Sequence, residues 1–205
     1  MTNREPGVGR YAQPEREQRW LLARRPDDLR RPVAIVDRYI AGTRLRLRRM
    51  QSSAGVTHKL GQKVRPDPSS PVLVQLTNIY LSDDEYALLL PLGGHQIGKT
   101  RWRWTVGGET LAVDEFSGEL AGLVLAEIEL RPEEPRRPSP SVAVAEVTED
   151  DRFSGAGWPP PPRRSCGPCW PASALRPGRP LRPRRSSLRR RTGRPPWCNR
   201  IHRNR

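Results

Sequence analysis

Charged side chains of one sign recur at alternate positions in several segments of this chain. Glu15 and Glu17 are two residues apart and are followed at the same spacing by Arg19. Three further groups have this spacing: Arg44, Arg46 and Arg48; Lys99, Arg101 and Arg103; and Glu127 with Glu129. Residues two apart in a β-strand point to the same face of a sheet. Each segment therefore predicts a strand with one face of a single charge.

These two kinds of charged face have complementary chemistry. Arginine and lysine neutralise phosphate oxygens, and arginine does so with two parallel hydrogen bonds. Paired carboxylates bind a hard divalent cation, which in turn bridges to phosphate. The spacing of Glu15 and Glu17 directs both carboxylates at one point, as metal ligation requires. The pattern suits a polyphosphate bound together with Mg²⁺ or Mn²⁺.

The elements that position these residues are mainly strands, because apolar residues alternate with the charged ones. Tight links at Ala41-Gly42 and Gly107-Gly108 favour antiparallel hairpins. A capping box starting at Ser82 predicts one helix to about Leu90, and residues 26–31 suggest a helical turn. Residues 143–153 are expected to be structured after a Pro-rich loop. The eight expected strands are 12–22, 33–41, 43–50, 55–64, 71–80, 98–106, 109–116 and 121–131.

Two arrangements could accommodate strands with one charged face. An open sheet could expose that face to water, but a solvated face usually intersperses charges of both signs. Here the signs are segregated by strand, which favours a closed barrel with a charged lumen and apolar faces turned outward to helices and loops. We therefore predict a mainly β (α+β) fold, a closed eight-stranded antiparallel β-barrel with a few flanking helices.

The net charge of the protein comes from its C-terminal part. Residues 159–205 contain fourteen arginines and no acidic residue, so the formal charge of +15 leaves +1 for residues 1–158. This tail is rich in Pro and Arg and poor in aliphatic residues, and we expect it to be disordered. The predicted domains are a barrel over 8–158 and a tail over 159–205, with nucleic acid bound only non-specifically through the tail.

Cysteine usage and hydropathy bear on location. Cys166, Cys169 and Cys198 all lie in the tail, and a body without cysteine fits a reducing cytoplasm. No apolar run is long enough to span a bilayer, and the polar start of the chain is unlike a signal peptide. We expect a soluble cytoplasmic protein with no membrane partner, and consider a homodimer as its assembly.

The ordered motifs between about residues 12 and 155 resemble the CYTH family of triphosphate tunnel metalloenzymes, in an actinobacterial-type form. This family groups class IV adenylate cyclases, thiamine triphosphatases and bacterial tripolyphosphatases. The matching segments are 15–22 (Glu-x-Glu), 37–48 (Tyr…Arg-x-Arg), 58–63 (the lysine strand), 99–101 (Lys-x-Arg), 113–116 and 125–130 (the closing hairpin), and 146–153 (Glu-Val-Thr…Asp-x-Arg).

The resemblance implies a divalent-metal-dependent hydrolase of tripolyphosphate or a small organic triphosphate, bound in the lumen with Mg²⁺ or Mn²⁺. A class IV-type adenylate cyclase and a non-catalytic polyphosphate- or nucleotide-binding module are the alternatives. The implied metal ligands are Glu15, Glu17, Glu129 and Asp114. The implied triphosphate ligands are Arg19, Arg46, Arg48, Lys59, Lys63, Lys99 and Arg101, and the implied catalytic residues are Glu127 and Lys63. Glu127 and Asp114 could instead only pair with a lumen arginine.

The chain also departs from the family pattern. Arg19 replaces the usual lysine of the first motif, which keeps the charge but changes its reach. Gln75 and Thr77 stand where many members have a carboxylate. The family has a helix after the motif at 146–153, whereas here the Pro/Arg-rich tail begins at residue 159.

Two other motifs match known patterns without the context that their chemistry needs. Residues 93–100 fit the P-loop pattern Gly-x₄-Gly-Lys-Thr, which requires a following helix whose N-terminus cradles phosphate. The alternating segment after Lys99 predicts a strand instead. The Cys166-Gly-Pro-Cys169 pair lacks the βαβ surroundings of a redox motif, and a zinc set with Cys198 and His202 would need a long Arg-rich spacer. His58 is interpreted as an ordinary strand residue.

Overall fold

The computed structural model describes residues 11–66, 73–131 and 133–153. The predictions for the tail, including its disorder and its cysteines, lie outside these residues. Within them one α-helix, α1 (Asp83–Leu89), and two short 3-10 helices (Gly118–Leu120 and Asp151–Phe153) accompany the strands. The strands are β1 (Gln13–Leu22), β2 (Arg30–Ile40), β3 (Leu45–Ser52), β4 (Gly55–Val64), β5 (Leu73–Leu81), β6 (Gly94–Val106), β7 (Glu109–Phe116), β8 (Val124–Leu130) and β9 (Ala143–Glu146).

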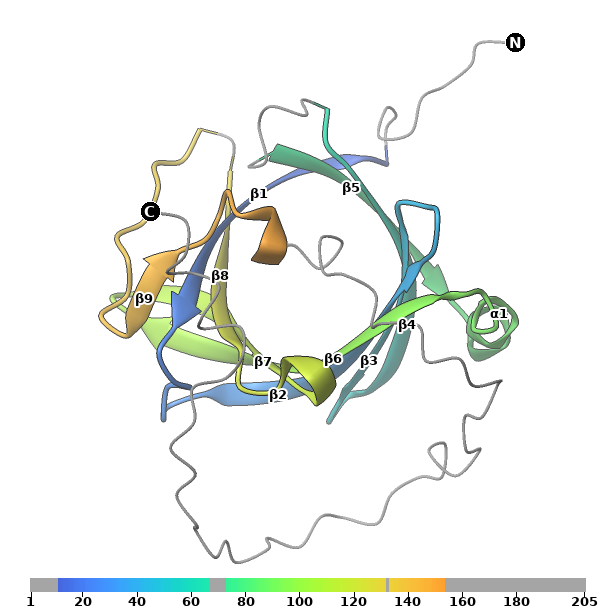
Figure 1. The fold of residues 1–205 in the computed structure, drawn as a ribbon, viewed down its shortest axis with the longest axis horizontal. Coiled ribbons are helices and arrows are strands. Elements are labelled where there is room, and N and C mark those ends of the chain that lie inside the picture. Colours follow the sequence, from blue (N-terminus) through green and yellow to red (C-terminus); the bar gives the residue numbers. More distant parts are fainter. Residues whose placement is uncertain (1–10, 67–72, 132, 154–205) are drawn as a thin grey trace, which may run out of the picture. The chain divides into compact units, whose positions relative to one another are not determined.

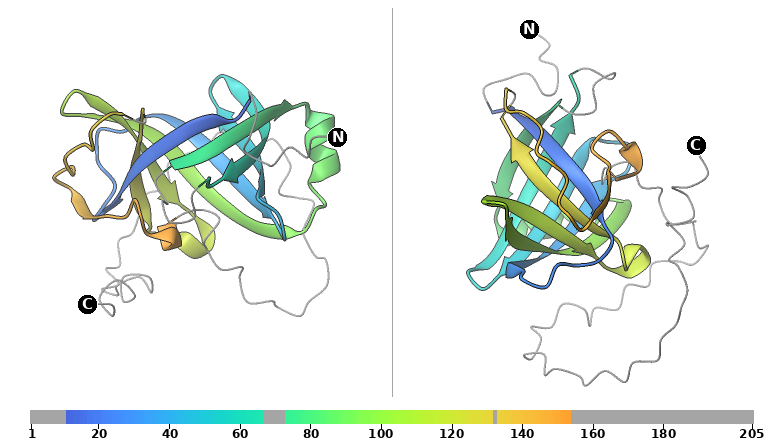
Figure 2. Two further views of the ribbon diagram at one scale, coloured as in Figure 1. Left: turned by 90° about the horizontal axis from the view of Figure 1, so that it is seen from above. Right: turned by 90° about the vertical axis from the view of Figure 1, so that its left-hand side faces the viewer.

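Eight of these strands close into an antiparallel barrel. The hydrogen-bonded order is β5-β4-β3-β2-β6-β7-β8-β1, and β1 also pairs with β5, which closes the ring. Figure 1 is a view down this ring, and Figure 2 shows the strands that form its wall from two other directions. The remaining strand, β9, pairs with the C-terminal end of β1, on the edge opposite β8, whereas β5 pairs with the N-terminal end of β1. The predicted barrel is confirmed.

Two local expectations were wrong. Residues 26–31 form no helical turn, because β2 already begins at Arg30 with a register shift before Val33. The strand expected from residue 98 begins earlier, at Gly94, where a Cβ atom would lie 2.1 Å from the carbonyl oxygen of Tyr39. Glycine is therefore needed for this close approach. Residues 94–106 form one continuous strand, as the alternating residues after Lys99 predicted. A P-loop needs a helix at this point, so the P-loop interpretation is excluded.

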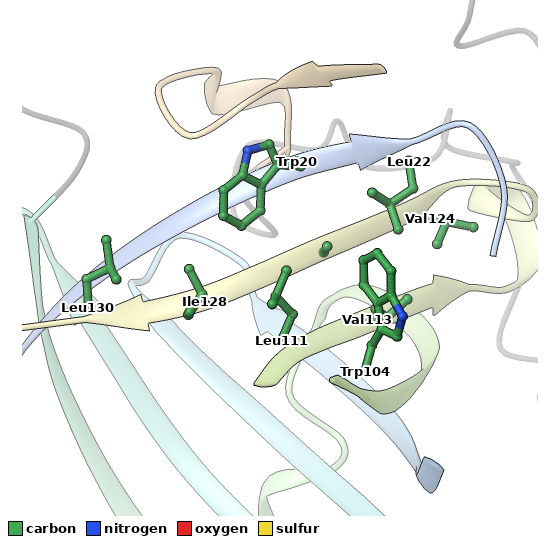
Figure 3. Close-up of a cluster of buried hydrophobic side chains, with 9 residues drawn as sticks. Trp20, Leu22, Trp104, Leu111, Val113, Val124, Ile128 and Leu130 are labelled. Atoms are coloured by element: carbon green, nitrogen blue, oxygen red, sulfur yellow. The ribbon is translucent and has the colours of Figure 1, made fainter. Parts of the chain in front are cut away.

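The apolar core lies on the outer face of the barrel wall. Trp20, Leu22, Trp104, Leu111, Val113, Val124, Ala126, Ile128 and Leu130 form one buried cluster on β1, β6, β7 and β8 (Figure 3). The segment after β8 covers this face, since Trp20 Nε1 donates a hydrogen bond to Ser139 Oγ at 3.1 Å and Val142 packs against the cluster. On this side a loop and β9 provide the cover, with no helix among the described residues.

Helix α1 begins as its capping box predicts. The Ser82 hydroxyl accepts a hydrogen bond from the Glu85 backbone N–H, and the Glu85 carboxylate accepts one from the Ser82 N–H. The helix lies outside the barrel beside β4 (Figure 1), where the Tyr86 ring stacks on His58 with centroids 4.0 Å apart. His58 therefore contributes to packing on the outer face, as expected of a strand residue. No helix in the described ranges has the length and apolar character to cross a membrane.

Candidate functional site in the barrel lumen

The pairing registers turn the charged faces of the strands toward one another. Arg19 lies opposite Glu127 across β1 and β8, and Arg101 lies opposite Asp114 across β6 and β7. Directly opposed residues of an antiparallel pair share a face. A cavity of about 720 Å³ occupies the interior of the barrel. Its lining carries nine basic residues, Arg19, Arg44, Arg46, Arg48, Lys59, Lys63, Arg65, Lys99 and Arg101, against the four acidic residues Glu15, Glu17, Asp37 and Glu127.

Glu15 and Glu17 converge on one cation. Lys63 Nζ lies 3.1 Å from Glu15 Oε2 and 3.1 Å from Glu17 Oε1. The second oxygen of Glu17 accepts a hydrogen bond from Arg19. The i, i+2 spacing on β1 therefore does what the sequence predicted and brings both carboxylates to one point.

A second group of charges surrounds Arg101. Its guanidinium donates to both carboxylate oxygens of Asp114, at 2.7 and 2.6 Å, and to Glu127 Oε2 at 2.6 Å. Lys99 also contacts Asp114, whose side chain has no exposed surface. Arg19 Nε donates to the other oxygen of Glu127 at 3.1 Å. Asp114 and Glu127 thus have the ion-pair geometry that the sequence left open as an alternative to metal binding or catalysis.

Sequence reasoning missed Asp37 as a site residue. The β2–β3 hairpin pairs Asp37 with Arg48, which donates to both its carboxylate oxygens at 2.6 and 2.7 Å. Arg46 Nε lies 3.6 Å from the same carboxylate, which is only 2% exposed. The signal was present, because Asp37 lies on the lumen face two residues before Tyr39. Which basic residue pairs with Asp37 depends on the length of the turn between β2 and β3, and the residue types alone did not specify that length.

The ion pairs shift the ionisation of the lumen groups. Burial alone would raise the pKa of Glu127, but the charges of Arg101 and Arg19 outweigh it and hold that pKa well below its ordinary 4.5. Burial likewise opposes ionisation of Asp37, yet hydrogen bonds and charge from Arg48 hold its pKa below 3.8. Burial lowers the pKa of Lys99 and of Lys63 below 10.5, against the opposing charges of Asp114 and Glu15.

These shifts predict a loss of stability in acid. A carboxyl group whose pKa is lower in the folded protein contributes stability that is complete above its unfolded pKa and is lost as the pH falls toward the folded value. The free energy of unfolding should therefore stay nearly level from pH 7 to about 5 and fall below pH 4.5, where Glu127 and then Asp37 begin to take up protons in the unfolded chain. Urea unfolding followed by tryptophan fluorescence measures this.

The Asp37→Asn variant is the control for this acid transition. It removes one of the two lumen carboxyl groups whose pKa is held low, so its stability should fall less steeply between pH 4 and 3 than that of the native protein. An unchanged slope in this variant would contradict the assignment of acid sensitivity to the Asp37–Arg48 pair.

Two predicted site residues, Glu129 and Lys59, line different cavities. Glu129 is opposite Glu17 in the β1–β8 register but has an exposed side chain, and it lines a smaller cavity of about 430 Å³. Lys59 faces the larger cavity, with its ammonium 4.7 Å from the centre of the Tyr80 ring and no carboxylate partner among the described residues. Five residues line both cavities: Glu15, Glu17, Met50, Arg101 and Glu127. The glutamates thus lie where the two cavities adjoin.

The donor set near β1 fits a divalent cation in part. In the described ranges no three carboxylate, imidazole or thiol side chains are already assembled as a metal centre. Glu15 and Glu17 nevertheless converge on a positive charge, and Glu15 Oε2 is buried without accepting a hydrogen bond. Hard carboxylate oxygens are the ligands that Mg²⁺ and Mn²⁺ prefer. Glu15 and Glu17 could hold such an ion, with Glu129 adjacent in register.

Comparisons with known proteins agree with this barrel. The chain matches no protein-family model and no curated protein sequence. A structure of the hypothetical protein NE1496 is 25% identical, covering 70% of this chain and 95% of its own, with a TM-score of 0.50. A second structure, described as the inorganic triphosphatase NE1496, is 25% identical, covering 70% and 92%, with a TM-score of 0.49. The PH1819 protein of Pyrococcus horikoshii OT3 is 21% identical, covering 58% and 79%, with a TM-score of 0.43. The likeness to NE1496 is consistent with a CYTH-type barrel.

Proposed function

We propose that this protein is a divalent-metal-dependent hydrolase of inorganic tripolyphosphate or a small organic triphosphate, bound in the barrel lumen. The observation that carries the proposal is the charge of the larger cavity, where nine basic residues face four acidic ones. A cavity lined mainly by charge of one sign attracts ions of the opposite sign, and the basic residues still exceed the acidic ones when the buried Asp114 behind Lys99 and Arg101 is counted, so a polyanion is the favoured occupant. The likeness to NE1496, which is described as an inorganic triphosphatase, supports the same substrate class.

The basic residues divide into two groups by their present partners. Lys99, Arg101 and Arg48 are fixed by buried carboxylates, so their positions are set before any ligand enters. Fixed donors cost little reorganisation when an anion binds, which favours tight binding. Arg46 Nε is buried and makes no hydrogen bond, so it has donor capacity available to phosphate. Lys59, which has no carboxylate partner among the described residues, would also be available to the anion, because it lines the same cavity.

Glu15 and Glu17, with Glu129 beside them, would hold Mg²⁺ or Mn²⁺ where the two cavities adjoin. Such an ion would neutralise phosphate oxygens and would make water a better nucleophile toward phosphorus. Glu127 has both carboxylate oxygens engaged by Arg19 and Arg101. We assign to Glu127 the positioning of these two guanidinium groups, and to Lys63 a contact with the departing or terminal phosphate.

Phosphate release tests this function directly. The full-length protein is incubated with tripolyphosphate or with ATP, with Mg²⁺, with Mn²⁺ or with EDTA, and orthophosphate, pyrophosphate and cyclic nucleotide are quantified separately. The proposal expects metal-dependent orthophosphate release from tripolyphosphate. Cyclic nucleotide with pyrophosphate from ATP would indicate the cyclase instead. Thermal stabilisation by tripolyphosphate without turnover would indicate a binding module, and neither release nor stabilisation would refute a lumen site for triphosphate.

A further inference from the structure

Lys63 occupies the point at which the two β1 glutamates converge. Its ammonium is 3.1 Å from one oxygen of Glu15 and 3.1 Å from one oxygen of Glu17, although Lys63 lies on β4 and the glutamates on β1. The Glu15 oxygen accepts no hydrogen bond, so its contact with Lys63 is one of charge alone. A single positive charge therefore holds together the two carboxylates that are suited to a divalent cation.

Lys63 is also less firmly fixed than Lys99, the buried lysine of the lumen. Its side chain is 34% exposed, whereas that of Lys99 is 9% exposed and contacts the fully buried Asp114. The lysine ammonium is carried on a flexible four-carbon side chain, so it can change direction without any movement of the strand. The larger cavity, which Lys63 lines together with Arg19 and Arg46, lies within that reach.

We infer that Lys63 holds the place of the divalent cation while the lumen is empty and turns toward the bound anion when the cation enters, so that metal and triphosphate bind cooperatively. This inference rests on the proposed function. A divalent cation and the Lys63 ammonium compete for this pair of carboxylate oxygens, because the two positive charges repel each other at contact distance. The displaced ammonium then joins Arg19 and Arg46, and an entering polyanion offsets the positive charge gathered there. Each ligand therefore favours the other by the same factor.

Metal binding measured without any phosphate tests the place-holding role. The affinity for Mn²⁺ is determined by electron paramagnetic resonance of free Mn²⁺ for the native protein, Lys63→Met and Lys59→Met. We expect Lys63→Met to bind Mn²⁺ about tenfold more tightly than the native protein, within the usual range of coupling between sites. Lys59→Met is the matched control, because it removes a lumen lysine that contacts the Tyr80 ring and no carboxylate. If Lys63→Met binds Mn²⁺ no more tightly than the native protein or than Lys59→Met, the inference is overturned.

A second measurement uses the native protein and decides the matter even if Lys63→Met does not fold. Sulfate is a tetrahedral dianion that sequesters Mn²⁺ far less than tripolyphosphate does. At matched ionic strength, replacing chloride by sulfate should tighten native Mn²⁺ binding several-fold, about 5-fold or more, and should leave Lys63→Met unchanged. No effect of sulfate on the native protein would overturn the cooperativity. If the native protein binds no Mn²⁺, the proposed metal-dependent function fails as well; if it binds Mn²⁺ without these effects, only the role of Lys63 fails.

Discussion

The Glu17→Gln variant is expected to release phosphate from tripolyphosphate at least about 100-fold more slowly than the native protein in the presence of Mg²⁺. Loss of a residue that merely supports a metal ligand typically costs 10–100-fold in metal affinity or activity, so loss of a direct ligand should cost at least about 100-fold. The amide keeps the size of the side chain but removes the charge that a hard divalent cation requires. The measurement is the initial rate of orthophosphate release at saturating tripolyphosphate.

Binding of the anion should survive this change. The basic residues that are fixed by Asp37 and Asp114 do not depend on Glu17, so tripolyphosphate should still raise the unfolding temperature of Glu17→Gln in EDTA. Glu119→Gln is the matched control, since Glu119 is exposed in a short 3-10 helix outside the cavity lining. A Glu17→Gln protein with more than half the native rate would contradict the assignment of Glu17 to metal binding.

The Arg101→Met variant should lose stability, by about 3 kcal/mol or more in the free energy of unfolding. Removing one partner of a buried ion pair typically costs 3–5 kcal/mol, because it leaves an uncompensated charge. Here the change leaves the fully buried Asp114 with Lys99 alone and removes one of the two partners of Glu127. Tripolyphosphate binding should weaken in parallel, since Arg101 lines the cavity. Urea unfolding and the thermal shift with tripolyphosphate measure the two effects.

A control on the same strand separates charge burial from strand propensity. Arg103 is two residues from Arg101 on the same face of β6, is exposed, and makes no ion pair within the described ranges. Arg103→Met should change stability by no more than about 0.5 kcal/mol. Asp114→Asn leaves the buried Lys99 without its carboxylate, so it should cost stability in both backgrounds, and less in Arg101→Met than in the native protein, where Arg101 loses this partner as well. Equal destabilisation by Arg101→Met and Arg103→Met would refute the buried network.

Residue spacing predicted most of the strands and the side chains that share a face. Alternation along a strand is a local property, so the charged faces that contain Glu15, Arg46 and Lys99 were predictable from spacing alone. The capping box at Ser82 is local in the same way and placed the start of α1 correctly. Each charged strand face carries mainly one sign. This segregation favoured a closed barrel, because a barrel lets faces of opposite sign line one lumen.

Which charges meet in the lumen depends on strand order and register. Closure of the ring pairs β1 with β5 and β8, and these pairs join residues more than fifty positions apart. The hairpin register set Asp37 against Arg48, and a shift of one residue would have turned Asp37 to the other face. Whether Glu127 binds a metal or an arginine depends on distances of a few ångströms across the lumen. Period-two patterns carry no information on such distances, because they specify the direction of a side chain and leave its neighbours to strand order and register.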